Sequence, residues 1–376
     1  MPSLSLTDDQ IAILQGDQEN TLVAIPYYDG RRIGGSDLEL PVSGGQVEDD
    51  GSAAVTHSGK LIISDPDGSF IPKDYDDVLS PFGSELYILS EHRLGALSTR
   101  IPIGYFRVEE LPGYQEMRDR YRTGQWVHRG ASINVTIKGR LANVADDRFE
   151  APDESPTGSS TWDEIARVAR MPITRSLVPD KNIGTKLSYE DDRLAAVALL
   201  AANIDGVPYE TPEGTLSVRP KVSSGDPVWK LVYGDAGGVV TPPRSLSRDG
   251  FANVFITRNE QGADGAQVQG RAAIESGPLR AGGPMGYIPR FKNNPLVMTN
   301  AAAVADAVTT RDNALKAFTY KITVQALPNP TLIPGDVVAF DYFDEEVSGT
   351  ILKTTLPHHG LQTLELQVET GSSPWA

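Results

Sequence analysis

Hydrophobic and polar positions alternate most regularly between Leu296 and Val368, near the C-terminus. Apolar side chains first recur in steps of four and three, which marks one face of a helix and predicts a helix over about residues 299–318. The side chains that define this face are Val297, Ala301, Val304, Val308, Leu315 and Phe318. From Tyr320 to Ala326 the period changes to two, which predicts a half-buried strand.

Three more strands are predicted after this one. A Pro-Gly-Asp turn at residues 334–336 begins a strand at 337–343, because proline restricts φ and glycine accepts a left-handed conformation. Further strands are predicted at 349–356 and 361–369, and in the last one leucine and valine alternate with glutamate and glutamine. The C-terminal module is therefore expected to be one helix that leads into a short antiparallel meander.

The first part of the chain, to about residue 145, has the pattern of short strands joined by turns. Strands are predicted at 22–28, 53–57, 60–64, 84–90, 101–108 and 132–138. Turn residues separate them, so we expect a sheet that closes on itself or packs as a sandwich. The polar and charged segment 113–130 is predicted to be a long hairpin loop that reaches a neighbouring subunit.

The pattern becomes helical after a polar connector at 147–160. Thr161, followed three residues later by Glu164, fits a capping box at the start of a helix. A second helix is predicted over about 189–203, with Ser188 as its cap. A small hairpin follows this helix, so this region is expected to be a compact α/β insert.

The chain returns to strands and loops after the insert. Strands are predicted at 228–233, 239–240 and 251–258. Residues 262–270 and 276–295 are rich in glycine and proline and are predicted to be loops for binding or assembly. The fold class is therefore mainly β with an α+β insert. The predicted domains are 1–146, 147–222 and 223–376.

Composition and charge narrow the function. The chain has 376 residues and a formal net charge of −16, which argues against a nucleic-acid-binding surface. It contains no cysteine, so disulfides, thiolate metal sites and cysteine nucleophiles are excluded. Neither a membrane-spanning apolar run nor a secretion signal is recognisable, and we expect a protein that is made and kept in a cytoplasm.

The sequence contains no strong motif for catalysis or for binding a metal or cofactor. No nucleophile elbow or phosphate-binding loop is present. His358 and His359 are predicted to lie in a solvated turn, while His57, His92 and His128 are isolated. The Asp65-Pro66-Asp67-Gly68 segment resembles part of a calcium loop but is better interpreted as a turn. We therefore predict no catalytic residue, no cofactor and no metal site.

Three acidic runs contain adjacent carboxylates that a glycan hydrolase could use as a catalytic pair. They lie at 74–77, 190–192 and 344–346. Such runs usually lie on solvent-exposed faces of a protein, and we predict the same for these three. A carbohydrate-binding adhesin is ranked last, because aromatic residues make up only 7% of the chain and are not concentrated in loops.

The order of several segments carries a resemblance to a known family. The matching segments are Lys60 to Gly68, Leu79 to Leu86, Pro102 to Val108, Asp147 to Pro152, Arg248 to Val254, and the C-terminal helix with Asn329 to Val338. In this order the chain resembles the minor tail proteins of actinobacterial siphophages, which carry a tail domain related to the baseplate hub fold.

This resemblance implies a structural protein rather than an enzyme. It implies a homotrimeric hub at the distal tip of a virion tail, with two barrel-like β domains in each chain flanking the insert. The implied partners are the distal tail protein, the tape measure protein and tip or receptor-binding proteins, with DNA only in transit. Assembly would take place in the host cytoplasm.

Two long segments are predicted to make subunit contacts. Segments 113–130 and 262–295 are both long, and the first combines tryptophan with arginines, residue types that are enriched at interfaces. The candidate interface residues are Arg118, Arg120, Arg122, Trp126, Tyr287 and Phe291. A second hypothesis is that acidic residues face the lumen of the hub.

Overall fold

The computed structural model describes residues 6–120, 124, 126–221, 226–232, 244–245, 251–260, 265–316, 319–342 and 345–369. This part of the chain is mainly β, as predicted. The helices are α1 (Asp8–Gln15), α2 (Leu141–Asp146), α3 (Thr161–Ala169), α4 (Arg193–Asn203) and α5 (Asn300–Lys316). The strands are β1 (Glu19–Tyr28), β2 (Arg31–Arg32), β3 (Val42–Asp50), β4 (His57–Asp65), β5 (Ser84–Leu94), β6 (Leu97–Arg120), β7 (Trp126–Gly139), β8 (Asp153–Glu154), β9 (Ser188–Tyr189), β10 (Gly206–Glu210), β11 (Leu216–Pro220), β12 (Trp229–Leu231), β13 (Arg244–Ser245), β14 (Val254–Asn259), β15 (Val268–Ala273), β16 (Pro289–Asn293), β17 (Thr319–Ala326), β18 (Val337–Tyr342), β19 (Glu345–Pro357) and β20 (Gln362–Glu369).

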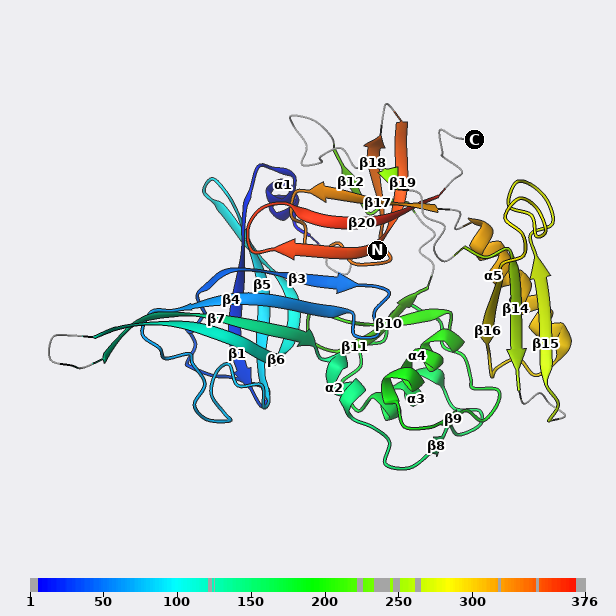
Figure 1. Cartoon of the computed structure of the whole chain (residues 1–376), viewed down its shortest axis with the longest axis horizontal. Coiled ribbons are helices and arrows are strands. Elements are labelled where there is room, and N and C mark those ends of the chain that lie inside the picture. Colours follow the sequence, from blue (N-terminus) through cyan, green and yellow to red (C-terminus); the bar gives the residue numbers. More distant parts are fainter. Residues whose placement is uncertain are drawn as a thin grey trace.

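The largest sheet joins strands from both ends of the chain (Figure 1). Its order is β13-β17-β20-β19-β3-β4-β7-β6-β5-β1-β2, and β18, which pairs with β12, also pairs with β19. The link is β19 against β3, with Lys353 opposite Asp50 and Pro357 opposite Gln46. Among the described strands β2 pairs only with β1 and β13 only with β17, so these strands form no closed barrel. The prediction of two barrel-like domains is therefore not confirmed.

The period-two pattern places the core as predicted. In β7, Ile133, Val135 and Ile137 are at most 2% exposed, whereas Asn134 between them is exposed. In the C-terminal strands β17 and β20 the predicted inward faces are likewise buried. Each such side chain contributes about 1.5–3 kcal/mol by leaving water. The alternation in the sequence was sufficient to predict which side chains are buried, because one face of each strand packs on a core.

Two N-terminal predictions are wrong. Residues 53–57 were expected to be a strand, but 51–56 form the turn between β3 and β4. Segment 113–130 was expected to be a loop, but β6 and β7 continue as a paired ribbon until Arg120 lies opposite Trp126. The ribbon projects from the body as an arm at the left of Figure 1. Backbone pairing, rather than apolar alternation, makes this segment a strand.

The insert confirms the predicted helices and hairpin but shifts both caps. Ser160, not Thr161, caps α3, because the Ser160 side chain accepts the N–H of Asp163. Asp192 caps α4. The predicted cap Ser188 instead belongs to the short strand β9, and the chain must turn once more before α4 begins.

A small lobe, defined here as β14, β15, β16 and α5, forms a separate three-stranded sheet with one helix. Strand β15 begins inside the first segment that was predicted to be a loop, and β16 lies inside the second, so those predictions are wrong at 268–270 and 289–293. The predicted helix is confirmed as α5, but it packs on the small sheet rather than on the meander that follows it. None of the described helices is long and apolar enough to cross a membrane.

The predicted apolar face of α5 is also wrong. Ala303 and Ala307 are fully buried, while Val304 is 43% exposed. A Cβ on Gly270 of β15 would lie 2.1 Å from the backbone carbon of Ala303, so helix and sheet approach too closely for a larger side chain at either position. Because the helix and the sheet lie so close together, only alanine fits between them at positions 303 and 307, and Val304 remains exposed.

Candidate functional site

The predicted interface residues fall into two groups at opposite ends of the molecule (Figure 1). The arm carries Arg118, Arg120 and Trp126 near its tip, where β6 pairs with β7. The Arg120 side chain is exposed, and its Nε donates to the carbonyl oxygen of Gly124 at 3.4 Å. Arg122 lies outside the described residues, as do the side chains of Arg118 and Trp126.

The second group lies on the small lobe. Tyr287 is 70% exposed in the loop before β16, and Phe291 is 53% exposed on β16 itself. The loop is ordered around the fully buried Asn253, whose side-chain amide donates to the carbonyl of Gly286 at 2.9 Å and whose Oδ1 accepts the N–H of Ile288 at 2.8 Å. Tyr287 and Phe291 are therefore held on a fixed backbone.

Helix α5 covers one face of the small sheet through a polar anchor. Asp306 of α5 accepts hydrogen bonds from Thr257 Oγ1 at 2.7 Å, Lys292 Nζ at 2.8 Å and Asn294 Nδ2 at 3.2 Å. Burial by itself raises the pKa of Asp306, but the hydrogen bonds from Lys292 and Thr257 outweigh it and hold this pKa below its usual range. The anchor identifies Thr257 and Lys292 as residues of the covered face.

The other face of the small sheet is open. Side chains alternate along a strand, so the neighbours of Thr257 and Lys292 point away from α5. Ile256 pairs with Arg271 on one side and with Phe291 on the other, which makes one row across all three strands. The Arg258 guanidinium lies over the Phe291 ring at 4.4 Å from its centroid. Hereafter Ile256, Arg258, Arg271 and Phe291 are called the open face.

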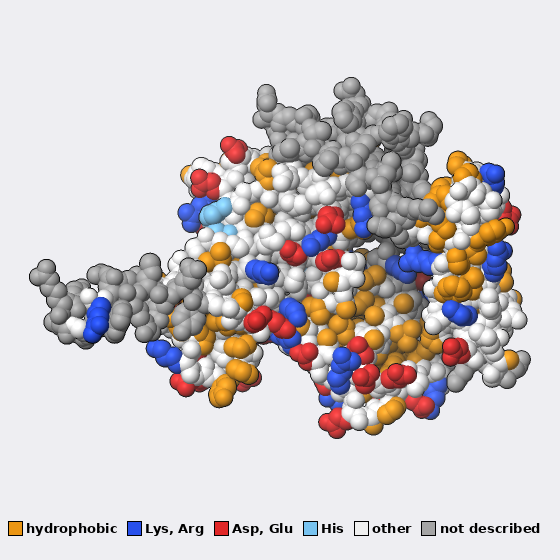
Figure 2. All heavy atoms as spheres, viewed as in Figure 1, with side chains coloured by type: hydrophobic (Ala, Val, Ile, Leu, Met, Phe, Trp, Pro, Cys, Tyr) orange, Lys and Arg blue, Asp and Glu red, His pale blue; other side chains and the backbone are white. Residues whose placement is uncertain are grey.

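The small lobe is locally basic, unlike the chain as a whole. Of its described residues from 251 to 316, which include α5, seven are basic and four are acidic. The basic ones are Arg258, Arg271, Arg280, Arg290, Lys292, Arg311 and Lys316, and the acidic ones are Glu260, Glu275, Asp306 and Asp312. The whole chain has 34 basic and 50 acidic residues. Figure 2 shows this lobe at the right, where hydrophobic and Lys or Arg side chains outnumber Asp and Glu.

A buried charged cluster joins three parts of the chain. His57 of β4 is 7% exposed and lies between Asp49 of β3, with Nε2 to Oδ2 at 3.4 Å, and Glu210 of β10, with Nδ1 to Oε2 at 3.5 Å. Burial alone would lower the pKa of His57, but the carboxylates of Asp49 and Glu210 raise it to about 9. We call these three residues the charged junction.

The insert reaches the charged junction because Gly139 leaves room for it. A Cβ on Gly139 would lie 1.9 Å from Oε2 of Glu210. The other oxygen of Glu210, Oε1, accepts the N–H of Leu141 at 2.7 Å. Burial raises the pKa of Glu210, and His57 opposes that effect. His57 was predicted to be isolated, which is wrong, and no spacing in the sequence signals its partners.

The predicted Pro-Gly-Asp turn lies beside this junction. Gly335 adopts φ of 97°, as the turn prediction requires, and its N–H donates to the carbonyl of Ile351 at 2.7 Å. The nearby cavity has a volume of about 40 Å³ and is lined by Asp49, His57 and Glu210, among other residues. Ligand sites usually occupy about 300–1,000 Å³. The charged junction therefore holds the parts of the chain together and has no room for a substrate.

The prediction that His358 and His359 lie in a solvated turn is wrong for His358, whereas His359 is exposed as predicted. His358 is 5% exposed, and its Nδ1 accepts the N–H of Leu22 at 3.0 Å. His359 Nδ1 lies 2.8 Å from the carbonyl oxygen of Asn20. Burial, together with the nearby His359, lowers the pKa of His358 to about 4. The pair fastens the turn between β19 and β20 to β1.

The carboxylates do not form a free catalytic pair among the described residues. Asp74, Asp76, Glu190 and Asp191 are exposed, which confirms the prediction of solvated faces. Asp344 and the side chains of Glu345 and Glu346 lie outside the described residues. In an open cavity of about 440 Å³, Asp146 and Glu109 both pair with Arg107, at 2.6 and 2.7 Å.

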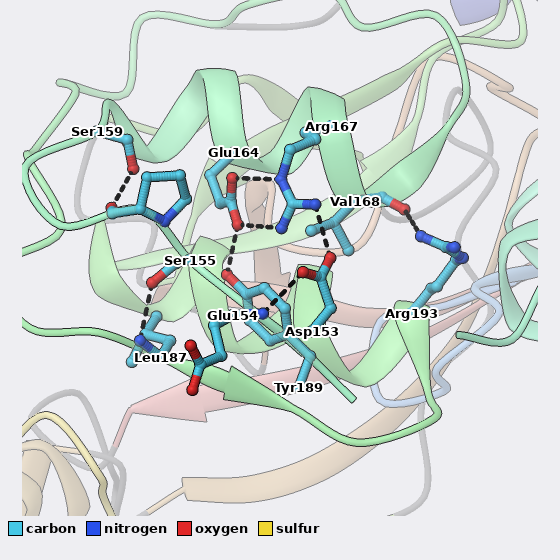
Figure 3. Close-up of polar contacts among 11 residues, drawn as sticks. Asp153, Glu154, Ser155, Ser159, Glu164, Arg167, Val168, Leu187, Tyr189 and Arg193 are labelled. Atoms are coloured by element: carbon cyan, nitrogen blue, oxygen red, sulfur yellow. Dashed lines mark hydrogen bonds and ion pairs between the residues drawn. The ribbon is translucent and has the colours of Figure 1, made fainter. Parts of the chain in front are cut away.

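The buried carboxylate Glu164 is also fully engaged (Figure 3). Arg167 donates two hydrogen bonds to it, both at 2.8 Å, and Tyr189 Oη donates a third at 3.0 Å. Arg167 also donates to Asp153 at 2.6 Å, which ties β8 to α3. This network fixes the insert. In the part of the chain that the structure describes, no group of three or more His, Asp and Glu side chains could hold a metal ion. Asp65 instead accepts the N–H groups of Gly68 and Ser69, as the turn interpretation predicted.

Comparisons with known proteins find relatives by structure only. No protein-family model matches the sequence, and no curated protein is significantly similar to it. The tail protein from Neisseria meningitidis MC58 is similar in structure with a TM-score of 0.62 at 11% identity, over 93% of this chain and 96% of that one. The 43 kDa tail protein of prophage MuSo2 from Shewanella oneidensis gives a TM-score of 0.57 at 12% identity, over 93% and 98%.

A third neighbour comes from a different assembly. The lidded PdpA-VgrG complex of Francisella gives a TM-score of 0.50 at 11% identity, over 95% of this chain and 53% of that one. These likenesses establish that the chain has a fold found in phage tail proteins. The expected resemblance to a tail family is confirmed at that level, and its restriction to actinobacterial siphophages stays a prediction.

Proposed function

We propose that this protein is a structural component of a bacteriophage tail and forms the trimeric hub that closes the distal tail tube. The observation that carries the proposal is the fold, which is similar to that of two tail proteins over 93% of the chain. The order of sequence motifs points independently to tail hub proteins. The carboxylates described above are either exposed or engaged by basic side chains and backbone N–H groups, which favours a structural role.

The proposal includes the place and partners of the protein. The hub lies at the virion tail tip and contacts the distal tail protein, the tape measure protein and tip or receptor-binding proteins. Each chain contributes two barrel-like β parts, one from each end of the sequence, and the insert lies at the periphery. Acidic residues face the lumen, so that DNA passes without binding.

The arm and the small lobe make the subunit contacts in this proposal. The arm reaches away from the body at one end, and the exposed Tyr287 and Phe291 lie at the other (Figure 1). Arg118, Arg120, Arg122 and Trp126 supply the arm contacts. Trp126→Ala is expected to weaken the trimer, measured by mass and thermal stability. An unaltered trimer in this variant would count against the arm as a subunit contact.

The first test is the mass of the purified protein by light scattering at several concentrations, with negative-stain images of the same sample. A trimer with a central opening is expected. A monomer at every concentration would contradict the trimeric hub. A peptidoglycan zymogram tests the alternative of a glycan hydrolase, and we expect no clearing.

A further inference from the structure

In the part of the chain that the structure describes, the open face of the small lobe leaves large side chains exposed to solvent. Helix α5 covers only the opposite face, through Asp306 and the close contact between Ala303 and Gly270. On the open face Phe291 is 53% exposed, and Arg271 is also exposed. Another molecule that covered this face would bury both side chains.

The open face has the composition of an interface centre. Arginine and aromatic residues dominate binding energy at protein interfaces, above all where they are already held in place. The Arg258 guanidinium stacks on the Phe291 ring at 4.4 Å, and a paired backbone holds both residues. Little conformational freedom is left to lose when a partner covers this pair.

Charge indicates the kind of partner. Of the described residues of the lobe from 251 to 316, seven are basic and four are acidic, whereas the whole chain carries a net charge of −16. The surface that best complements this basic lobe is acidic, and the rest of the same protein supplies such a surface. Nucleic acid is disfavoured, because the acidic body repels phosphates and the row centres on apolar Ile256 and Phe291.

We propose that the open face of the small lobe docks onto the acidic body of a second copy of this chain. The inference rests on the proposed trimeric function and adds the surface that forms the contact. The lobe lies at one end of the long axis (Figure 1), so the contact joins two different surfaces head to tail. Head-to-tail contacts close into rings when the rotation permits, as a trimer requires.

The test measures the oligomeric state of the full chain by light scattering across a dilution series. Phe291→Ala removes the aromatic anchor, and Arg271→Glu reverses one exposed charge. Each is expected to weaken trimer formation at least about tenfold, with Arg271→Glu more affected at low salt. Val304→Ala, which truncates an exposed apolar side chain on α5 at the opposite face of the same lobe, is the matched control and should leave the trimer unchanged.

The outcomes separate the inference from the proposed function. Unchanged secondary structure with a weakened trimer would support the open face as the contact. A wild-type trimer that both variants leave intact would overturn the inference and leave the hub proposal standing. A wild-type monomer at every concentration would overturn both. Binding of a short DNA duplex that Arg271→Glu abolishes, with the trimer intact, would also overturn the inference.

Discussion

The large sheet and the small lobe differ in how they bury apolar side chains. In the large sheet, long strands bury branched and aromatic side chains such as Ile63, Ile88 and Phe106, none of them exposed. In the small lobe, short strands and α5 meet through Ala303 and Gly270, and one face of the sheet stays open. The difference indicates that the large sheet is built for stability and the small lobe for contact.

The two regions also place charge differently. The large sheet buries His57 between Asp49 and Glu210, where the charges hold three parts of the chain in register. In the small lobe the Asp306 anchor is half-buried and Arg271 is exposed. Changes in the large sheet should therefore alter the free energy of unfolding, while changes on the open face should alter assembly.

The largest expected effect is in the core of the large sheet. Phe106→Ala removes a fully buried ring that stacks on His57 and should lower the free energy of unfolding by about 3–5 kcal/mol. Phe291→Ala, the same change on the open face, should lower it by less than about 1 kcal/mol. Urea unfolding of both variants measures the contrast. Equal losses would mean that the open face is part of a core.

The charged junction should make stability depend on pH. The pKa of His57 is raised to about 9 in the folded state, so its stabilisation is fully present below about pH 6.5 and is lost as pH rises through 9. His57→Gln removes this contribution, on the order of 2 kcal/mol. Urea unfolding of wild type and variant between about pH 6 and 10 should give curves that converge at high pH. Parallel curves would contradict a charged His57.

A smaller effect is expected where the helix and sheet of the small lobe meet. Gly270→Ala places a Cβ 2.1 Å from the backbone of Ala303 and should lower stability by about 1–2 kcal/mol, because α5 must move. Gly113→Ala is the control, since a Cβ on that strand residue meets no atom within 4 Å. Thermal melts of both variants are compared. A loss of stability in Gly113→Ala alone would contradict the close contact between Gly270 and α5.

The smallest effect tests which face of α5 is buried. Val304 is 43% exposed, so Val304→Ala should change the free energy of unfolding by less than about 0.5 kcal/mol. The same measurement on Ala303→Val should show a clear loss, because Ala303 has no free space beside Gly270. If Val304→Ala were the more harmful change, the face predicted from the sequence would be correct after all.

The sequence alone determined the elements whose pattern repeats along one strand or helix. Alternation in β7, β17 and β20 and the Pro-Gly-Asp turn were all predicted correctly, because local geometry dictates which side chains share a face. The existence of α5 was predicted for the same reason. Strand β3 was missed because its Val-Ser-Gly-Gly-Gln sequence has no apolar alternation, and pairing with β4 and β19 makes it a strand.

Only the tertiary structure decided which residues meet. Asp49 and His57 face each other across the pairing of β3 with β4, and the room at Gly139 lets Glu210, which is distant in sequence, join them. The buried face of α5 was set by how closely the helix approaches Gly270, a distance that hydrophobic periodicity does not contain. Local patterns therefore determined the elements of this protein, and long-range packing decided its charged junction and its open face.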